Sequence, residues 1–414
     1  MTDVSSAASA AARPAVSVLL AATALALLLG LQPATTDIYL PALPALTREL
    51  GAPMSHAQLT MSALILAFGI AQLVWGPIAD RVGRRPVLLL GLVLYTAASV
   101  GAMLAPTIGL LIVWRALQGA CLAAAVVCAR AMVRDLYEPQ QGAQVMALGL
   151  SGLGLIAIGG PALGGWVASI WGWRAALALV AGFGALTLAF VALCLPETLA
   201  RKNPRATEIG PLVAAWRRIA RHPSFVAWTL LITCTYGGLF TLLAGSAFIY
   251  IDVLGLSPGQ YGLAMASGSA SYLLGTVVCR RWIVRHGLAG AVRRGAGFTL
   301  GGGLAMLALA LAGVNAVWAV LLPQWLYAFG HGIHQPCGQT GAVGAFPQAA
   351  GAASALSGFV LAATAFFVSR WLGGALDGTV LPLAQCMAFW SLLTAATAWT
   401  LVQRLSRNVP PLAV

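Results

Sequence analysis

The stretch WGPIADRVGRRPVLLLG, residues 75–91, begins and ends with apolar residues but is charged in the middle. Its charged residues are Asp80, Arg81, Arg84 and Arg85. They are concentrated in a chain of 414 residues of which 60% are hydrophobic and only 8% are charged. A short charged loop between two apolar runs is typical of two transmembrane helices that are joined at the membrane surface.

The same pattern continues along the whole chain. Apolar runs separated by Gly, Pro and Arg have the length that a bilayer requires, about 20 residues each. The predicted spans are residues 16–38, 57–77, 87–105, 108–130, 142–167, 174–195, 224–250, 261–279, 295–313, 316–339, 350–371 and 379–403. These runs lack the alternation of polar and apolar residues that marks a membrane β-barrel. The sequence therefore predicts an all-α integral membrane protein with twelve transmembrane helices.

The basic residues predict its orientation. Cytoplasmic loops are enriched in Lys and Arg, and 19 of the 23 basic residues fall on one side of the predicted spans. They are Arg13, Arg81, Arg84, Arg85, Arg130, Arg134, Arg201, Lys202, Arg205, Arg217, Arg218, Arg221, Arg280, Arg281, Arg285, Arg293, Arg294, Arg404 and Arg407. Only Arg48 and Arg174 fall on the other side, so both termini are predicted to be cytoplasmic. Basic residues that cluster between apolar spans, rather than along one soluble face, also argue against nucleic-acid binding.

The longest polar stretch divides the chain into halves of six spans each. The predicted domains are an N-terminal six-helix bundle (1–195), a cytoplasmic linker (196–223) and a C-terminal six-helix bundle (224–414). GTVVCRRWIVRHG (275–287) follows the eighth span much as GPIADRVGRR (76–85) follows the second. Two six-span halves related as parallel repeats are typical of transporters that bind their substrate between the halves.

The chain shows no motif for an enzyme or a resident cofactor. There is no phosphate-binding loop and no Ser-His-Asp arrangement. The seven cysteines mostly lie inside apolar runs and predict neither a disulfide framework nor a metal site. We therefore expect a non-enzymatic protein without metal or cofactor, driven by an ion gradient.

The loop GPIADRVGRRP (76–86) resembles the signature loop between the second and third helices of the major facilitator superfamily. The matching residues are Gly76, Asp80, Arg81, Gly83, Arg84 and Arg85. The resemblance implies that Asp80 lies near the cytoplasmic start of the eleventh helix, and that this loop latches the two halves while the transporter opens outward. The alternative is that the positive charge of this loop only sets the orientation of the protein in the membrane.

The fourth predicted span contains a buried basic residue. Arg115 is followed at i+3 and i+4 by Gln118 and Gly119, which share its helix face. An intramembrane arginine is costly unless it faces a polar cavity or a partner. The stretch resembles the superfamily motif that begins Arg-x-x-Gln-Gly and is tied to proton coupling. The alternative is that Arg115, about 10 Å deep at 1.5 Å per residue, reaches back to the outer interface.

The first span ends in LQPATTDIYLPALP (31–44), and Asp37 is the acidic residue within the first six predicted spans. This stretch resembles the bicyclomycin/chloramphenicol resistance (Bcr/CflA) subfamily of drug:proton antiporters. The resemblance implies that Asp37 lies in the cavity as a proton-coupling or substrate-binding carboxylate. The alternative is a cap at the outer interface.

The fifth span carries an element typical of antiporters in this superfamily. Gly160, Pro161, Gly164 and Gly165 match its Gly-Pro-x-x-Gly-Gly pattern. Proline and glycine at these positions permit a kinked, close helix crossing. Ile156 stands where the pattern usually has another glycine. Ordinary packing of small residues is the alternative.

Polar and aromatic residues in the second half are further candidates for substrate binding. His331, His334 and Gln335 share a face in the tenth span. They suit a proton relay, substrate hydrogen bonding, metal binding (the weakest case, without a third ligand) or a structural pair. Tyr236 and Phe240, at i and i+4, are candidates for the cavity wall. The substrate-binding candidates are Gln118, Tyr236, Phe240, His331 and His334.

These observations predict a monomeric, multi-pass protein of the bacterial inner membrane. We expect it to export small lipophilic or amphiphilic drugs of the chloramphenicol or bicyclomycin type by alternating access. Protons would enter through Asp37, assisted by Arg115. Export or import of an endogenous metabolite is the alternative.

Overall fold

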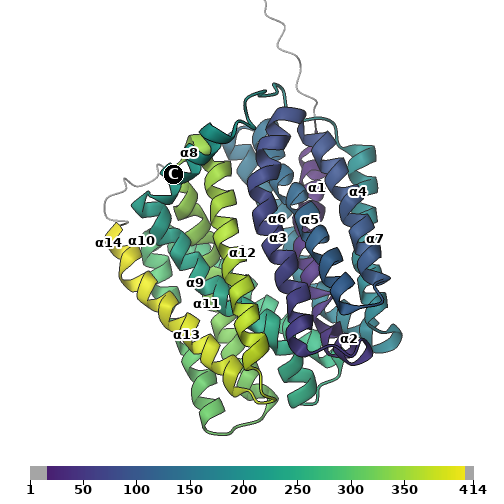
Figure 1. Cartoon of the computed structure of the whole chain (residues 1–414). Coiled ribbons are helices and arrows are strands. Elements are labelled where there is room, and N and C mark those ends of the chain that lie inside the picture. Colours follow the sequence, from purple (N-terminus) through teal and green to yellow (C-terminus); the bar gives the residue numbers. More distant parts are fainter. Residues whose placement is uncertain (1–15, 406–414) are drawn as a thin grey trace, which may run out of the picture.

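The computed structural model describes residues 16–405, and this part of the chain is built from helices connected by short loops, without β-strands. Figure 1 shows most of the long helices running side by side between two ends of the molecule. The amphipathic helix α8 (Ile209–Ala220) lies at one end and the short helix α2 (Leu43–Glu49) near the other. We call these the linker end and the far end.

The first six predicted spans all appear as helices. They are α1 (Val18–Asp37), α3 (Met54–Val82), α4 (Arg84–Met103), α5 (Ile108–Leu136), α6 (Pro139–Trp171) and α7 (Trp173–Cys194). The 3-10 turn η1 (Leu40–Ala42) precedes α2. Hydroxyl side chains begin two of these helices: Ser17 accepts a hydrogen bond from the backbone N–H of Leu20, and Thr107 accepts one from Leu110. Such caps satisfy backbone donors that have no partner inside the helix.

The second half begins at α9. Its elements are α9 (Pro223–Ala247), η2 (Phe248–Val253), α10 (Pro258–Leu311), α11 (Val317–Gly344), η3 (Pro347–Ala349), α12 (Ala350–Ala375), α13 (Leu381–Trp399) and α14 (Leu401–Leu405). The helix α10 contains both predicted spans 261–279 and 295–313, which meet at a kink. Gly287 has φ +67° at this kink, a conformation that glycine adopts without steric cost.

Ten helical segments of the described chain are long and apolar enough to cross a membrane. The kinked α10 is counted once among them, and the more polar α11 is not included. With α10 divided at Gly287 and α11 added, the described chain holds twelve spans, as predicted. The predicted linker, residues 196–223, begins two residues after the end of α7 and ends at the first residue of α9.

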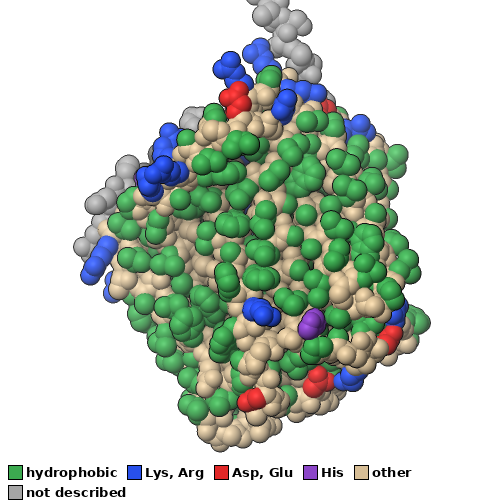
Figure 2. Space-filling model, in the orientation of Figure 1, with side chains coloured by type: hydrophobic (Ala, Val, Ile, Leu, Met, Phe, Trp, Pro, Cys, Tyr) green, Lys and Arg blue, Asp and Glu red, His purple; other side chains and the backbone are tan. Residues whose placement is uncertain are grey.

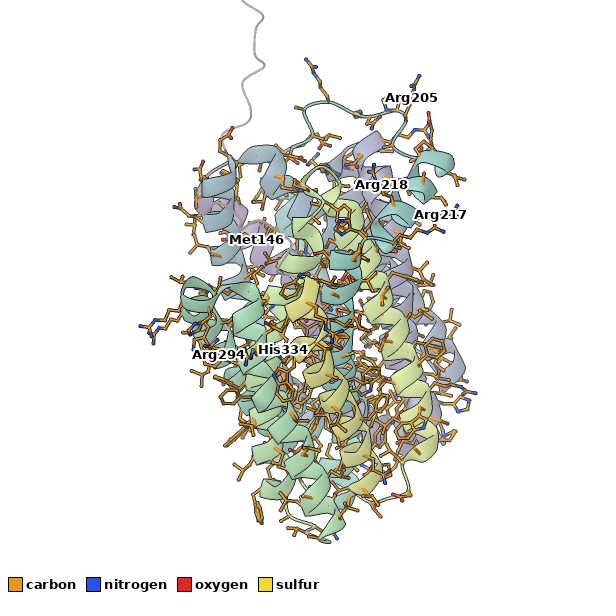
Figure 3. All side chains as sticks on the ribbon, turned by 90° about the vertical axis from the view of Figure 1, so that its left-hand side faces the viewer. Met146, Arg205, Arg217, Arg218, Arg294 and His334 are labelled. Carbon is orange, nitrogen blue, oxygen red and sulfur yellow. The ribbon has the colours of Figure 1, made fainter. Side chains whose placement is uncertain are left out.

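The surface agrees with a membrane location. Figure 2 shows a broad band of hydrophobic side chains between the two ends, with most of the Lys and Arg side chains in view gathered toward the linker end. Figure 3 shows Arg205, Arg217 and Arg218 at that end. Exposed large hydrophobic side chains of the long helices include Leu155, Leu193 and Phe367, which suits contact with lipid tails. Arg13 and Arg407 lie outside the described residues.

Candidate substrate and proton site

Arg115 lies inside the first half and is fully buried. Its Nη1 donates to Oε1 of Gln118 at 2.7 Å, and its Nη2 donates to the backbone carbonyl of Thr35 at 3.2 Å. The guanidinium carbon lies 4.3 Å from the ring centroid of Tyr39, a cation–π contact. These contacts tie α5 to the far-end part of α1 and the turn after it. They hold Arg115 in the interior rather than at the outer interface.

The network continues from Gln118, which is also buried. Its Nε2 donates to Oγ of Ser99 at 2.6 Å, and that hydroxyl donates to the backbone carbonyl of Tyr95 at 2.7 Å. The Tyr95 hydroxyl in turn lies 2.5 Å from Oγ1 of Thr35. The chain of contacts joins α5, α4 and α1. One donor, Nε of Arg115, has no partner, and no carboxylate among residues 16–405 forms an ion pair with this arginine.

Asp37 is the last residue of α1 and is half-buried. The hydroxyl of Thr36 donates to its Oδ1 at 2.7 Å. A Cβ placed on Gly160 would lie 3.6 Å from Cβ of Asp37, so this carboxylate lies against the glycine-rich part of α6. The turn η1, which follows Asp37, contacts α9 and α10 of the second half. Asp37 therefore lies where the second half approaches the first.

A cavity of about 100 Å³ lies between the two halves. It is lined by Gln32, Ile65, Phe68, Gln72, Arg130, Ile232, Tyr236, Gln335, Gln339, Ala342, Val343, Ser354, Ser357, Gly358, Leu361 and Ala362. These residues come from α1, α3 and α5 of the first half and α9, α11 and α12 of the second. Arg130 near the end of α5 and Ser354 near the start of α12 place it in the linker-end half of the molecule. Gln339 is exposed, so the cavity reaches the surface near this end.

The structure separates the predicted substrate-binding residues. Tyr236 lines the cavity, while Phe240, with its ring centroid 6.2 Å from that of Tyr236, is fully buried behind it. Gln118 belongs to the Arg115 network. His331 and His334 face the interior of the second half instead of the cavity. Nδ1 of His331 lies 3.0 Å from Oγ1 of Thr235.

His334 is likewise enclosed. Its Nε2 lies 3.2 Å from the backbone carbonyl of Val292, and its Nδ1 has no partner. Figure 3 shows His334 among the helices, below Arg205, Arg217 and Arg218 and at about the height of Arg294. Among the described residues, no three His, Cys, Asp or Glu side chains gather as metal ligands. The pair thus has the surroundings of buried structural histidines.

The predicted antiporter element forms a close crossing at the far end. A Cβ on Gly165 of α6 would lie 3.0 Å from the carbonyl carbon of Pro258, the first residue of α10. A Cβ on Gly262 of α10 would lie 3.0 Å from the carbonyl carbon of Pro161. Glycine on each helix therefore lets the two backbones touch. Gly164 faces the other way, with Cα of Ile38 2.6 Å from where its Cβ would be.

Further contacts join the halves at both ends. Nη1 of Arg48 pairs with Oδ1 of Asp252 at 2.9 Å at the far end, and Ser369 donates to the carbonyl of Gln58 at 3.1 Å. At the linker end, Nη1 of Arg130 donates to Oγ of Ser354 at 3.1 Å. The halves are thus joined by several contacts at the far end. Beside the mouth of the cavity they are joined by the hydrogen bond from Arg130 to Ser354.

The signature loop is held by ion pairs within the first half. Gly83, with φ +125°, separates α3 from α4. Arg84 is buried and pairs with Asp80 at 2.6 Å and with Asp135 of α5 at 3.0 Å. Arg81 donates to Oγ1 of Thr207 in the linker at 2.7 Å. Here the Asp80 carboxylate pairs inside its own half, and its predicted latch to the eleventh helix stays a prediction.

The remaining residues of the loop are also tied down. Arg85 donates to the backbone carbonyls of Leu195 and Ala192 at the end of α7, at 2.8 and 2.9 Å. Gly76 lies further up α3, where a Cβ would be 3.7 Å from Val127 of α5. A helix–helix approach at Gly76 and a turn at Gly83 are the roles expected of these glycines.

Comparison with known proteins identifies the family. Residues 25–369 match the model of the Major Facilitator Superfamily. This chain belongs to the major facilitator superfamily. It is therefore a transporter of the multi-pass membrane type, and its fold is shared with solved members. One is the xylose transporter XylE from E. coli, in a partially occluded inward open conformation, with a TM-score of 0.72 at 15% identity over 95% of this chain and 98% of that one.

Similarity to individual relatives shows which subfamily of the superfamily this chain resembles. Multidrug resistance protein D of Escherichia coli is 30% identical over 81% of this chain and 83% of its own length. A chloramphenicol resistance protein of Pseudomonas aeruginosa is 29% identical over 88% and 82%. An uncharacterized MFS-type transporter, YdgK of Bacillus subtilis, is 32% identical over 59% of this chain and 64% of that one. The predicted kinship with the Bcr/CflA subfamily is confirmed.

Several residues of this transporter's site escaped the sequence analysis. Glu197 holds the start of α4, since its Oε1 and Oε2 accept from the backbone N–H groups of Arg84 and Arg85 at 3.0 and 3.2 Å. A carboxylate is favoured at a helix N-terminus. In the cavity wall, Arg130, Gln32, Gln72 and Gln339 were missed as well, whereas Gln335 was among the residues that the sequence analysis singled out. Their signal was available, because polar side chains inside apolar runs are costly and need a reason.

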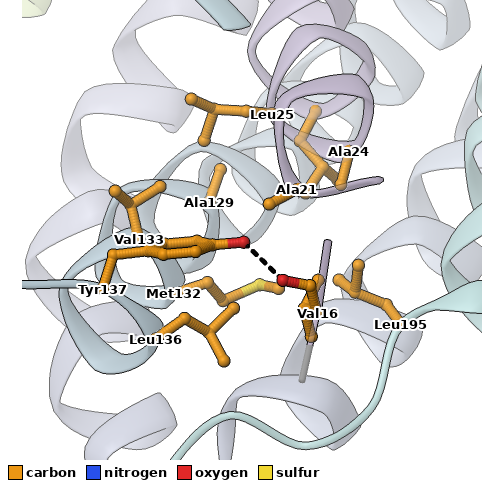
Figure 4. A pocket seen from close by; sticks show the side chains of 11 residues that line it. Val16, Ala21, Ala24, Leu25, Ala129, Met132, Val133, Leu136, Tyr137 and Leu195 are labelled. Carbon is orange, nitrogen blue, oxygen red and sulfur yellow. Dashed lines mark hydrogen bonds between the residues drawn. The ribbon is translucent and has the colours of Figure 1, made fainter. Parts of the chain in front are cut away.

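A second, smaller pocket lies within the first half, away from the cavity (Figure 4). It is bounded by apolar side chains of α1 and α5, and the Tyr137 hydroxyl donates to the carbonyl of Val16 at 2.9 Å. Partial burial raises the pKa of Tyr137. With almost no polar lining, it is a packing gap at the linker end rather than a transport site.

Proposed function

We propose that this protein is a proton-coupled exporter of small lipophilic or amphiphilic drugs in the bacterial inner membrane. It works as a monomer by alternating access, with both termini in the cytoplasm. The proton gradient supplies the energy, and no cofactor takes part. In this orientation the linker end is cytoplasmic, in keeping with the gathering of basic side chains there.

The cavity between the halves is the observation that supports this proposal best. It is built from both halves, has mixed apolar and amide walls, and reaches the surface at the cytoplasmic end. Relatives are named for resistance to several drugs and to chloramphenicol.

The proton site lies outward of this cavity. Gln32 lines the cavity, and Asp37 follows one and a half turns further along α1. Tyr236 lines the cavity and belongs to α9, which contacts the turn η1 directly after Asp37. A proton on Asp37 removes its charge at this boundary between the halves. Binding of a drug beside Tyr236 and release of the proton are thereby coupled.

Two packed regions serve alternating access. The glycine crossing of α6 and α10 closes the outer end while the cavity faces inward. The signature loop, with Arg84 held by two carboxylates, forms a rigid unit beside the linker. When the outer end opens, we expect Asp80 to exchange its partner for the start of α12 and close the inner end. Arg115 keeps α1, α4 and α5 together through this movement.

The experiment is efflux in everted membrane vesicles of a host without its own pumps. The wild-type protein should lower susceptibility of that host to chloramphenicol, bicyclomycin or a sulfonamide, and should collapse an imposed pH gradient when the drug is added. Asp37→Asn should abolish both. Asp377→Asn removes an exposed acid and serves as the matched control.

Full proton-driven efflux by the Asp37→Asn variant would refute the coupling role. If a metabolite is exchanged in a counterflow assay and none of the drugs is transported, the substrate would instead be that endogenous metabolite.

A further inference from the structure

The charge of the cavity wall is positive and is not balanced by an acidic residue. Of its sixteen lining residues, Arg130 is the one that carries a charge, and none is acidic. Four glutamines and two serines supply the other polar side chains, and the rest is apolar or aromatic. This composition offers hydrogen bonds to a ligand but no carboxylate to balance a positive one.

Arg130 has no acidic partner. Its one hydrogen bond to a side chain is to Oγ of Ser354, across the boundary between the halves. No Asp or Glu oxygen of residues 16–405 lies within ion-pair distance of it. A guanidinium has five N–H donors in a planar fork, so most of this donor capacity is left for a ligand in the cavity.

The surroundings of Arg130 are positive as well. Arg134, four residues along α5, lies on the same face, and its Nη2 would be 3.7 Å from a Cβ on Gly351 at the start of α12. The N-terminus of a helix carries a partial positive charge. Two arginines and a helix N-terminus thus converge at the mouth of the cavity. A cation entering here is repelled, while a negative or electron-rich group is attracted.

The glutamines of the wall can form hydrogen bonds with the uncharged part of a ligand. Oε1 of Gln335 is buried in the structure and has no hydrogen-bond partner. A buried acceptor without a partner costs free energy, and a ligand amide or hydroxyl would satisfy it. Gln72, which lies across the cavity on α3, is 5% exposed.

From this arrangement we propose that the cavity selects hydrogen-bonding compounds that present a carboxylate, nitro or sulfonyl group and carry no positive charge, and that Arg130 sets this preference. The inference rests on the proposed export function and names its substrate class. Asp37, the nearest acid along α1, is not part of the cavity wall. It therefore does not provide a binding site for a cationic drug in this state.

The test compares three probes on purified full-length protein by equilibrium binding. Chloramphenicol is neutral and carries a nitro group, chloramphenicol hemisuccinate is an anion, and tetraphenylphosphonium is a lipophilic cation. We expect the anion to bind at least about tenfold more tightly than the cation, because like charges repel strongly in a poorly solvated cavity. Arg130→Gln should reduce this ratio about tenfold, whereas Arg130→Lys should keep most of it.

Arg285→Gln is the matched control, because Arg285 is exposed near the same end and is not part of the cavity wall. Equal binding of cation and anion by the wild-type protein would overturn the inference, and so would an equal effect of Arg130→Gln and Arg285→Gln. Neither of these two results would contradict the proposed drug export if the vesicle assay still shows it. Absence of binding and of efflux for all three probes would refute the export function together with this inference.

Discussion

The two halves of this transporter have the same helical plan but different chemistry. The first half contains buried Arg115, half-buried Asp37 and the ion-paired Arg84. The second half, residues 224–414, has only two of the ten acidic residues, Asp252 and Asp377. Its buried polar side chains are histidine, threonine, serine and glutamine. Buried and ion-paired charges are thus concentrated in the first half, and the proposed proton coupling assigns a role to two of them, Asp37 and Arg115.

Their repeated loops differ in the same way. The first loop turns at Gly83 and is fixed by Asp80, Asp135 and Glu197. The related stretch in the second half turns at Gly287, and Arg281 and Arg285 are exposed there. No ion pair holds this second stretch within the described residues. Ion pairs therefore fix the first loop, and none of those in the described residues fixes the second.

The largest effect is expected at Arg115. Arg115→Lys keeps the charge but cannot reach Gln118, Thr35 and Tyr39 together, because an ammonium lacks the planar fork of a guanidinium. Transport should fall about 100-fold or more, the range of groups that act in proton transfer. The measurement is drug efflux in everted vesicles at matched expression. Efflux within twofold of wild type would show that the network of the first half is not needed.

The helix crossing between the halves comes next. Gly262→Ala places a methyl group against the backbone of Pro161, and such overpacking costs about 1–3 kcal/mol. We expect a lower apparent Tm in detergent and slower transport. Gly159→Ala is the matched control, because nothing lies within 4 Å of its added Cβ. Equal behaviour of the two variants would mean that the close crossing does not form.

The comparison of the two loops predicts unequal effects of the same substitution. Arg84→Gln leaves Asp135 without its partner and should destabilise the protein by about 2 kcal/mol. Arg281→Gln in the second loop should change stability by no more than about 0.5 kcal/mol. Thermal unfolding of both variants checks this prediction. A greater loss for Arg281→Gln would contradict the view that ion pairs stabilise the first loop more than the second.

The smallest effect concerns Asp377, which follows α12. The hydroxyl and backbone N–H of Thr379 donate to its carboxylate and hold the pKa of Asp377 below its ordinary value of 3.8. A lowered folded-state pKa stabilises the protein above the unfolded pKa, and this contribution is lost as pH falls through the folded value.

Thr379→Val removes the hydroxyl, so the apparent Tm should drop slightly at neutral pH. The difference from wild type should shrink in acid, where Asp377 is protonated in both proteins. A gap that stays constant with pH would trace the loss to packing rather than to the hydrogen bonds.

Hydropathy and glycine spacing were enough to predict the twelve spans and the turn at Gly83, because membrane insertion constrains these features strongly. The helical extension of both spans into residues 280–294 was not predicted, since arginines there end the apolar runs without ending the two helical segments that meet at Gly287. Periodicity placed His331 and His334 on one face but could not say what that face meets. Their burial in the second half follows from the packing of α11 against α9 and α10.

The partners of charged residues were hardest to predict. Glu197 is 113 residues from Arg84, and Arg130 is 224 residues from Ser354. Contacts of this separation depend on how helices pack, which a single sequence does not record. The Gln118 contact of Arg115 was foreseeable because it lies within one turn of the same helix.

Proton release on drug binding tests the central claim most directly, since that claim places the coupling proton on Asp37 in the first half. Chloramphenicol is added to purified protein in weakly buffered detergent solution, and the pH change is followed with a dye. Wild-type protein is predicted to release protons, and Asp37→Asn none, with Asp377→Asn unchanged from wild type. Undiminished proton release by Asp37→Asn would contradict the account and would direct attention to His331 and His334 in the second half.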